Sequence, residues 1–329
     1  TLDSIRYTAP LSFVSQDRAV TSSDYKSLLL KNISGIKDIV AWGGELEDRP
    51  QFGKVFLAFK PEGAELMTAA QKTEVLDYIQ GKKLVTMDVQ IVDPTYTYLY
   101  FDINFRYNPT FSSLSAGEYE ILIREKIKLF NEVNLNRFDG IFRHSKFLNS
   151  IDLTDTAILS SSSNVKAYKK LTVSNTRADI QSIKFNFELE GDMNQNNSMI
   201  TTTLFQDNDG KQVRVGDRFI SNLNYRQLYT YTTDNAGREV VIKPNIGYLY
   251  PDTGEIAIDN LNLSATTDIL FFVESKSKDV LTNKRNILTI DLNYCNFTAI
   301  QDTGMVQSSG ATAVGGVPGS STSYSGSGY

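Results

Sequence analysis

The sequence predicts an α+β protein with an N-terminal ferredoxin-like split βαβ sandwich, a short helical segment and then a mostly antiparallel β domain. Helical patterns and β-rich runs alternate in the first third of the chain. Helical spacing of apolar residues dominates the stretch that follows, up to Asp152. Beyond Asp152, short β-rich stretches are separated by turn residues, which is typical of antiparallel sheets.

We divide the chain into four parts: an α/β sandwich domain over residues 1–115, a helical connector over 116–175, a β-rich domain over 176–302 and a Gly/Ser-rich C-terminal tail over 303–329. A length of 329 residues suits about two folded domains. Composition and periodicity change around the serine run Ser160–Ser163, so we expect the α/β and β parts to separate there.

The first helix is predicted over Thr21–Leu30, which starts with capping side chains and continues with good helix formers before Gly35. Two β-rich runs then follow, Ile36–Trp42 and Lys54–Phe59, with a polar loop between them. The order of elements at this point is therefore αββ.

A second helix is predicted over Ala69–Gln80, with Thr68 as its cap. Strands are predicted at Leu84–Val92 and at Tyr96–Phe105, which extends the order to αββαββ. A leading strand near Leu11–Val14 would complete a split βαβ sandwich like that of ferredoxins.

Helical spacing predicts a third helix over Glu118–Phe130 and a short one over Phe142–Asn149. Six later stretches read as strands: Ile183–Leu189, Ile200–Phe205, Glu239–Lys243, Gly254–Ile258, Ile269–Val273 and Ile287–Leu292. From Thr303 onward, Gly, Ser, Ala and Thr dominate, and such a segment buries too little apolar surface to order itself. We expect another subunit to order this tail.

The charge and hydropathy of the chain indicate which classes of partner are not expected. The net charge of −5 comes from interspersed acidic and basic residues without a basic stripe, so nucleic acid is not an expected partner. There is no long apolar run and no signal pattern, so we expect no membrane insertion, and Thr1 resembles the cut end of a longer chain. Cys295, the single cysteine, fits assembly in a reducing cytoplasm, and we expect it to be buried and inert.

No catalytic, metal or cofactor site is predicted. His144 is the single histidine and stands among cationic residues, which favours a packing or surface role over a general base, and zinc sites lack ligands. Asp207–Gly210 resembles the start of a calcium loop, but Arg218 occupies the place of the bidentate Glu, so a hairpin turn is favoured. Asp252–Gly254 is predicted to be a turn. We expect a protein that is not an enzyme.

Two further patterns in the sequence give little support for a phosphate loop or a carboxylate pair. Gly43 and Gly44 fit neither a P-loop nor a dinucleotide fingerprint. Alternation along strands scatters Asp88, Asp93 and Asp102 over different faces, so a carboxylate pair is not expected.

Aromatic residues are plentiful, with 17 Tyr and 18 Phe against one Trp. Tyr96, Tyr98 and Tyr100 fall on one face of their strand, and the residues between them leave neither face plainly polar. Both faces are therefore expected to be covered. Intramolecular packing is favoured, and the alternative is that part of the tyrosine face meets another subunit.

The segment Asp17–Leu28 resembles the entry motif of the baseplate J-like family of contractile tails, in which RAVT..DY opens a helix. Later segments are similar to large myophage wedge proteins in the same order: Trp42–Glu45, Phe52–Phe56, Lys60–Pro61, Ile91–Pro94 and Arg143–Asp152. The resemblance spans roughly Ser15–Val173 and identifies residues 1–115 as the baseplate J-like domain.

The resemblance implies the C-terminal portion of a baseplate wedge protein of a contractile-tailed, myovirus-type bacteriophage. Such a subunit is located in the virion tail baseplate after assembly in the host bacterial cytoplasm. It binds itself, as a homodimer or ring contact, and other wedge and hub proteins. It links wedges into a ring around the hub and transmits the change that triggers sheath contraction, and thus viral genome ejection. The family motif brings no catalytic residues.

Two other functions stay open at this point. A carbohydrate- or receptor-binding tail module is the main alternative, because β-rich domains with exposed aromatic rings often hold sugars. A single Trp weakens that reading. A tail lysin ranks third, because distant carboxylates can still meet in a folded chain.

Overall fold

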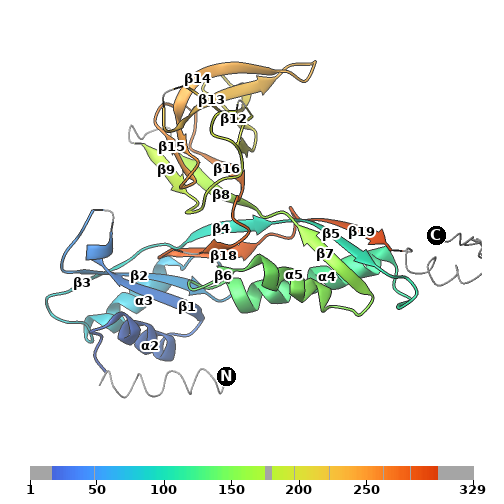
Figure 1. Cartoon of the computed structure of the whole chain (residues 1–329). Coiled ribbons are helices and arrows are strands. Elements are labelled where there is room, and N and C mark those ends of the chain that lie inside the picture. Colours follow the sequence, from blue (N-terminus) through green and yellow to red (C-terminus); the bar gives the residue numbers. More distant parts are fainter. Residues whose placement is uncertain are drawn as a thin grey trace, which may run out of the picture.

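The computed structural model describes residues 17–47, 49–174, 180–195, 197–221, 223–261, 263–281 and 283–302. Figure 1 shows three parts: an α/β unit beside the N-terminus, an extended platform, and an upper β domain standing on the platform. The predicted α+β class, with mostly antiparallel strands after a helical segment, is confirmed.

The α/β unit is a small sheet covered by two helices. Its elements are α2 (Ser22–Asn32), β1 (Ile36–Gly43), η1 (Gly44–Leu46), β2 (Lys54–Pro61), α3 (Ala69–Gln80) and β3 (Asp88–Ile91). β1 pairs antiparallel with β2, and β2 pairs parallel with β3. Both helices start with a capping box, at Thr21 and at Thr68, which satisfies the free amides of the first turn. Both predicted helices are confirmed.

The predicted strand Tyr96–Phe105 is not part of this unit. It forms two strands, β4 (Thr95–Tyr100) and β5 (Asp102–Tyr107), which break at Phe101 and enter two different sheets. Assigning it to the N-terminal sandwich was wrong, because its hydrogen-bonding partners come from much later in the chain. The leading strand expected near Leu11–Val14 lies outside the described residues.

The platform joins the middle of the chain to its C-terminal strands. Its elements, besides β4 and β5, are α4 (Ala116–Phe130), η2 (Asn131–Leu135), β6 (Ile141–Phe142), α5 (His144–Asp152), β7 (Ile158–Ser163), β17 (Val280–Leu281), β18 (Asn286–Ile290) and β19 (Asn296–Gln301). β18 pairs parallel with β4, and β19 pairs parallel with β5. The predicted helices at 118–130 and 142–149 are confirmed as α4 and α5.

Aromatic packing fixes α4 and α5 beneath the strands of the platform (Figure 1). The rings of Phe101 and Phe147 stack with their centroids 4.5 Å apart, and Phe142 lies 5.2 Å from Phe101. All three side chains are fully buried, so this cluster forms the centre of the platform core.

The serine run expected to mark a domain boundary is strand β7. Its residues pair antiparallel with β5, with Ser161 opposite Phe105 and Ser163 opposite Ile103. The run is thus part of the sheet of β19, β5 and β7, and a separation of the chain near it stays a prediction. The linear boundaries at 115, 175 and 302 remain predictions about separable pieces, and the sheets run across them because β18 and β19 return to β4 and β5.

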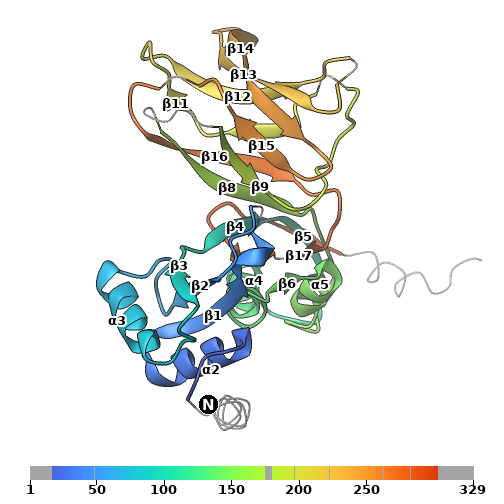
Figure 2. The same ribbon diagram turned by 90° about the vertical axis from the view of Figure 1, so that its left-hand side faces the viewer.

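The upper β domain consists of two facing sheets (Figure 2). Its strands are β8 (Lys166–Val173), β9 (Gln181–Lys184), β10 (Ile200–Thr202), β11 (Phe205–Gln206), β12 (Gln212–Arg218), β13 (Arg226–Thr233), β14 (Glu239–Tyr250), β15 (Glu255–Ile258) and β16 (Thr267–Glu274). One sheet has the order β11-β12-β13-β14-β15-β9, and the other has the order β10-β16-β8-β4-β18. The second sheet therefore includes two strands of the platform, so the two parts share one continuous sheet.

Candidate interaction surfaces

Aromatic side chains cover one face of the shared sheet. Tyr98 on β4 stacks on Tyr168 of β8, with centroids 4.7 Å apart and an interplanar angle of 8°. Tyr96 stacks on Tyr98 at 6.1 Å, and Tyr100 meets Phe272 of β16 edge-on at 6.0 Å. We call these rings, which share one face as predicted, the tyrosine ladder.

The ladder is held mainly by contacts within the chain. The Tyr98 hydroxyl donates to Glu65 Oε1, and the Tyr168 hydroxyl donates to Asp291 Oδ2, both at 2.6 Å. Burial raises the pKa of Tyr100 to about 12, so this phenol stays protonated and uncharged. The favoured reading of intramolecular packing is confirmed for these rings, while contact with another subunit stays a prediction.

The rings offer little to a sugar. Trp42 is 7% exposed and stacks on Phe56, and its indole nitrogen donates to Glu47 Oε1 at 2.7 Å. A sugar stacks on the open face of a ring, and both this indole and the ladder rings are engaged in packing. The packing of these rings therefore gives little support to the carbohydrate-binding alternative.

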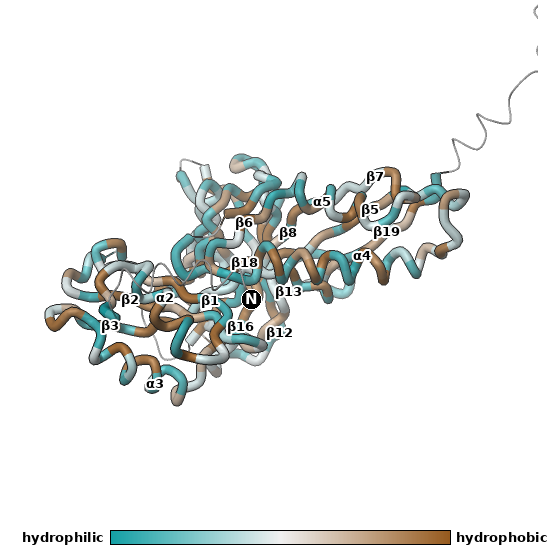
Figure 3. Tube along the Cα trace, turned by 90° about the horizontal axis from the view of Figure 1, so that it is seen from below, coloured by the Kyte–Doolittle hydropathy of each residue, from teal (hydrophilic) through white to brown (hydrophobic). Residues whose placement is uncertain are grey.

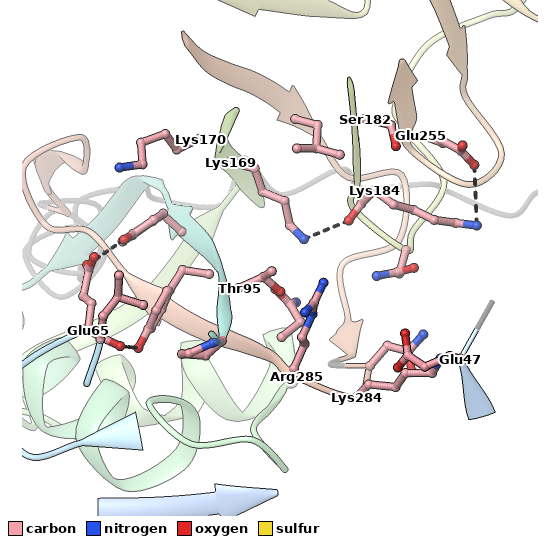
Figure 4. Close-up of a pocket in the computed structure, with 18 of the residues that line it drawn as sticks. Glu47, Glu65, Thr95, Lys169, Lys170, Ser182, Lys184, Glu255, Lys284 and Arg285 are labelled. Carbon is pink, nitrogen blue, oxygen red and sulfur yellow. Dashed lines mark hydrogen bonds and ion pairs between the residues drawn. The ribbon is translucent and has the colours of Figure 1, made fainter. Parts of the chain in front are cut away.

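A cleft of about 590 Å³ opens beside the ladder, where the α/β unit, the platform and the upper β domain meet (Figure 4). Five cationic side chains line it, against three carboxylates. The cations are Lys169, Lys170, Lys184, Lys284 and Arg285, and the carboxylates are Glu47, Glu65 and Glu255. We call this feature the basic cleft.

A second candidate surface is the outer face of α4. Its inner face buries Tyr119, Ile123, Ile127 and Phe130 against the sheet. On the outer face Ile121 is 64% exposed, and Leu129 and Val133 are each 59% exposed. Val133 belongs to η2, which continues α4, and the exposed Glu125 lies between Ile121 and Leu129, so these three apolar residues form an interrupted line that we call the α4 stripe. Figure 3 views the molecule from the side on which α4 lies.

His144 has a structural role. It is buried at the start of α5, and its Nε2 lies 3.1 Å from the carbonyl oxygen of Ser163 and 3.0 Å from its Oγ. Burial, together with the positive charge of Lys278, lowers the pKa of His144, so the ring is neutral in the folded protein. The ring hydrogen-bonds Ser163, and no carboxylate of the described residues hydrogen-bonds to it, which agrees with the predicted packing role.

Cys295 is buried, as predicted, and lies in the turn before β19 rather than within a strand. Burial raises the pKa of its thiol to about 11, and Sγ donates weakly to the Asp291 carbonyl oxygen at 3.4 Å. A thiol that stays protonated is a poor nucleophile, so Cys295 is inert.

The acidic turns are ordinary turns. Asp207 Oδ1 accepts from the amides of Asp209 at 2.9 Å and Lys211 at 2.8 Å, and Gly210 has φ of +77°. The predicted hairpin turn between β11 and β12 is confirmed, and Asp252–Gly254 is likewise the turn between β14 and β15. Within the described ranges, no group of three or more His, Cys, Asp or Glu side chains is placed to hold a metal ion.

The three aspartates considered for a carboxylate pair, Asp88, Asp93 and Asp102, are dispersed as expected. Asp93 pairs with Lys72 at 2.6 Å, and Asp102 pairs with Lys166 at 2.5 Å. Asp88 is exposed at the start of β3. Each lies in its own setting, so no acid–base pair forms among them.

Gly44 belongs to a tight turn and not to a phosphate loop. A Cβ at this position would lie 2.0 Å from the carbonyl oxygen of Gln51, and that close approach requires glycine. Within the part of the chain that the structure describes, no helix is long and apolar enough to cross a bilayer.

Three buried charged residues, Asp217, Arg226 and Lys169, were not singled out from the sequence. Arg226 and Asp217 form a fully buried ion pair, with Nε 2.5 Å from Oδ2, and no local pattern marks either residue. Lys169 did carry a signal, because it alternates with Ala167 and Leu171, the buried positions of β8. A period of two thus places its stem on the interior face.

Comparison with known proteins gives two family matches. Residues 21–92 match the model of baseplate structural protein gp6, C-terminal domain I, and residues 95–170 match C-terminal domain III of the same protein. The step from one match to the next coincides with the passage from β3 to β4, where the chain leaves the α/β unit for the platform.

Among curated proteins, the chain is 23% identical to baseplate wedge protein gp6 of Enterobacteria phage T4 over 172 residues, 52% of this chain. It spans 25% of the length of that relative. Among solved structures, a chain of the 6-fold symmetrised anti-feeding prophage baseplate is 13% identical, with a TM-score of 0.36, over 50% of this chain and 37% of that one. The two family matches and the T4 relative identify residues 21–170 as the C-terminal portion of a baseplate wedge protein of a contractile-tailed phage.

Proposed function

We propose that this chain is a structural, non-enzymatic subunit of a tail baseplate wedge, and that it binds a second copy of itself through the α4 stripe. The observation that carries the proposal is a set of large, exposed apolar side chains on the outer side of α4 and η2, among charged residues such as Glu125 and Lys128. The inner side of α4 fills the platform core, while Ile121, Leu129 and Val133 are exposed by about 60% each. Surface helices of monomers normally present a polar outer side, so three large apolar side chains exposed there support a contact with another chain.

A second copy fits this stripe through twofold symmetry. In an isologous contact the same patch serves both partners, and a twofold axis perpendicular to α4 would let two α4 helices cross antiparallel. The stripe extends over about three helical turns, which is enough for interdigitating side chains.

The finer role is proposed from the similarity to baseplate wedge proteins. We infer that such contacts, with those to other wedge and hub proteins, link wedges into a ring around the hub of the virion tail baseplate. The shared sheet supports a part in transmitting the change that triggers sheath contraction. β4 pairs with β8 of the upper β domain on one side and with β18 on the other, so hydrogen-bonded strands couple the two parts. Assembly in the host cytoplasm is part of the same proposal.

Light scattering on the purified chain over a hundredfold concentration range tests self-association. We expect the mass of a dimer, with a dissociation constant of about 1 µM, because wedge contacts act together in the assembled ring. The double variant Ile121→Ser with Leu129→Ser should remain monomeric. Its thermal midpoint should stay close to that of the parent chain, because both side chains are exposed.

The upper β domain offers a matched control. Val240 and Val241 are 43% and 45% exposed, and replacing both with Ser removes similar apolar area away from α4. This control should dimerise like the parent chain. A parent chain that stays monomeric throughout, or an α4 double variant that dimerises equally well, would contradict the proposal.

A further inference from the structure

We propose that the basic cleft is an oxyanion-binding site whose occupant is an acidic segment of a neighbouring protein subunit. The anion site is argued from the cleft alone, while the identity of the occupant rests on the assembly role proposed above. The starting observation is Lys169, a lysine that is 6% exposed and lines the cleft.

Lys169 is a buried cation without a counter-ion. Its ammonium donates to the carbonyl oxygen of Lys184 at 2.8 Å and lies 5.8 Å from the centre of the Phe185 ring. No carboxylate within the described ranges forms an ion pair with it. An ammonium has three N–H donors, and a buried charge that is only partly compensated is costly.

The other cations of the cleft differ in whether they are neutralised. Lys170 pairs with Asp268 at 3.3 Å, and Lys184 pairs with Glu255 at 3.7 Å. Lys284 donates to the carbonyl oxygen of Leu46, and no ion pair is formed by Arg285 among the described residues. Three of the five cations, Lys169, Lys284 and Arg285, therefore have no carboxylate partner among those residues.

The unpaired groups face the same space. Figure 4 shows the side chains of Lys169 and Arg285 directed toward one another, one from β8 and the other from the segment before β18. An anion bound in the cleft would be attracted by both of these cations. Guanidinium and ammonium groups both bind carboxylate oxygens well.

The acidic side chains of the cleft do not fill this role. Glu65 accepts from the Tyr98 hydroxyl, Glu47 accepts from the Trp42 indole, and Glu255 is the partner of Lys184. Each is occupied elsewhere on the cleft wall. The anion would thus come from outside the described part of the chain.

The dimensions favour a protein segment over a small ion. A volume of about 590 Å³ is that of a pocket for a peptide or drug-sized ligand, well above the need of one sulfate. Leu66, Pro94 and Ile183 add apolar wall between the charged groups. Cations spread over such a pocket suit several carboxylates carried by one chain.

The pKa of Lys169 agrees with the proposal that a carboxylate binds in the cleft. Burial lowers the pKa of Lys169 to about 8, so its charge is only just retained at neutral pH. A bound carboxylate would raise that pKa, and linkage then requires that binding weaken as pH rises above about 8. The structural alternative, in which Lys169 only ties β8 to β9, predicts no such pH dependence.

The test uses fluorescence anisotropy with a labelled hexaglutamate peptide. The host is the full chain carrying Ile121→Ser and Leu129→Ser, so self-association through α4 does not affect the result. We expect saturable binding of hexaglutamate and none of hexaglutamine. Arg285→Gln and Lys169→Met should each weaken binding at least tenfold.

Lys211→Gln is the matched control, because it removes one exposed cation from the turn between β11 and β12 and should change affinity less than twofold. Equal binding by Arg285→Gln and Lys211→Gln, or no saturable binding at all, would overturn the anion site. Inorganic sulfate that binds as tightly as hexaglutamate would overturn the protein segment as occupant. Arg285 is exposed, so its variant stays informative if Lys169→Met fails to fold.

Discussion

The upper β domain and the platform differ in how far apart in the sequence their paired strands lie. In the upper β domain β12, β13, β14 and β15 pair in chain order, each with its neighbour. In the platform Asn286 pairs with Thr95, 191 positions earlier, and β19 pairs with β5 across a similar separation. The first arrangement closes through short turns, whereas the second exists only after the intervening chain has folded.

Their interiors differ as well. The platform core is aromatic and apolar, centred on Phe101, Phe142 and Phe147. The upper β domain instead encloses a charged pair, Arg226 with Asp217, both with 0% side-chain exposure. The upper β domain thus adds a buried ion pair to an apolar core that is continuous with that of the platform.

The largest loss of stability is expected when the buried ion pair of Arg226 and Asp217 is broken. Arg226 also donates to the carbonyl oxygens of Met193, Gln195 and Asn197 at 2.7–2.9 Å, and so fixes the loop before β10. Arg226→Met removes these bonds and leaves the Asp217 carboxylate buried without its cation. We expect a loss of about 3–5 kcal/mol in the free energy of unfolding, measured by urea denaturation followed by circular dichroism.

Arg238 and Asp234 provide the exposed counterpart in the same domain. They pair at 2.9 Å on the turn between β13 and β14, and the Arg238 side chain is 81% exposed. Arg238→Met should change stability by no more than about 0.5 kcal/mol, because solvent screens this pair. Equal losses at both arginines would show that burial is not what makes the inner pair important.

A somewhat smaller effect is expected where the α/β unit meets the platform. Ile287 on β18 is fully buried with Trp42 and Phe56 of the α/β unit and with Phe138. Ile287→Ala leaves a cavity there and should cost about 3 kcal/mol. Trp42 fluorescence should report the loss directly, because the indole belongs to the same cluster.

Leu281 is a nearby control with 52% exposure, and Leu281→Ala should alter stability by less than about 0.5 kcal/mol. If Ile287→Ala leaves the Trp42 transition unchanged, the C-terminal strands do not stabilise the α/β unit. The contrast between local and distant pairing would then lose its energetic basis.

Local chemistry explains what could be predicted from the sequence. The capping side chains Thr21 and Thr68 accept from the amides of Asp24 and Gln71 as their positions suggested, because a cap needs only residues three apart. The turn at Asp207–Gly210 was predictable for the same reason, since its bonds lie within the turn.

Distant pairing explains what could not be predicted. The break at Phe101 makes sense only once β18 and β19 occupy the neighbouring edges of β4 and β5. The serine strand β7 depends on β5 in the same way. Of the candidate surfaces, the tyrosine face was predicted from the alternation of side chains along a strand. The same alternation could have placed Lys169 on a buried face. The α4 stripe needed the structure to show which side of the helix is buried.

The smallest effect concerns the contact between α5 and β7, in which His144 binds Ser163. Burial, aided by Lys278, lowers the pKa of His144, while Asp279 and the hydrogen bond to Ser163 oppose the shift. The unfolded chain, with a pKa of about 6.5, therefore binds the proton more tightly than the folded one. Stability is fully present above this value and is lost as pH falls through it. One proton limits the slope of stability against pH to about 1.4 kcal/mol per pH unit, which is less than the loss expected for Arg226→Met or Ile287→Ala.

His144→Gln keeps an amide donor but cannot titrate, so the difference in stability between pH 7.5 and 5.5 should shrink relative to the parent chain. Carboxylates titrate equally in both proteins and cancel in this comparison, which urea midpoints at the two pH values provide. The same pH dependence in both proteins would mean that the imidazole accepts its proton without leaving the fold, and that the packing of α5 on β7 does not depend on a neutral ring.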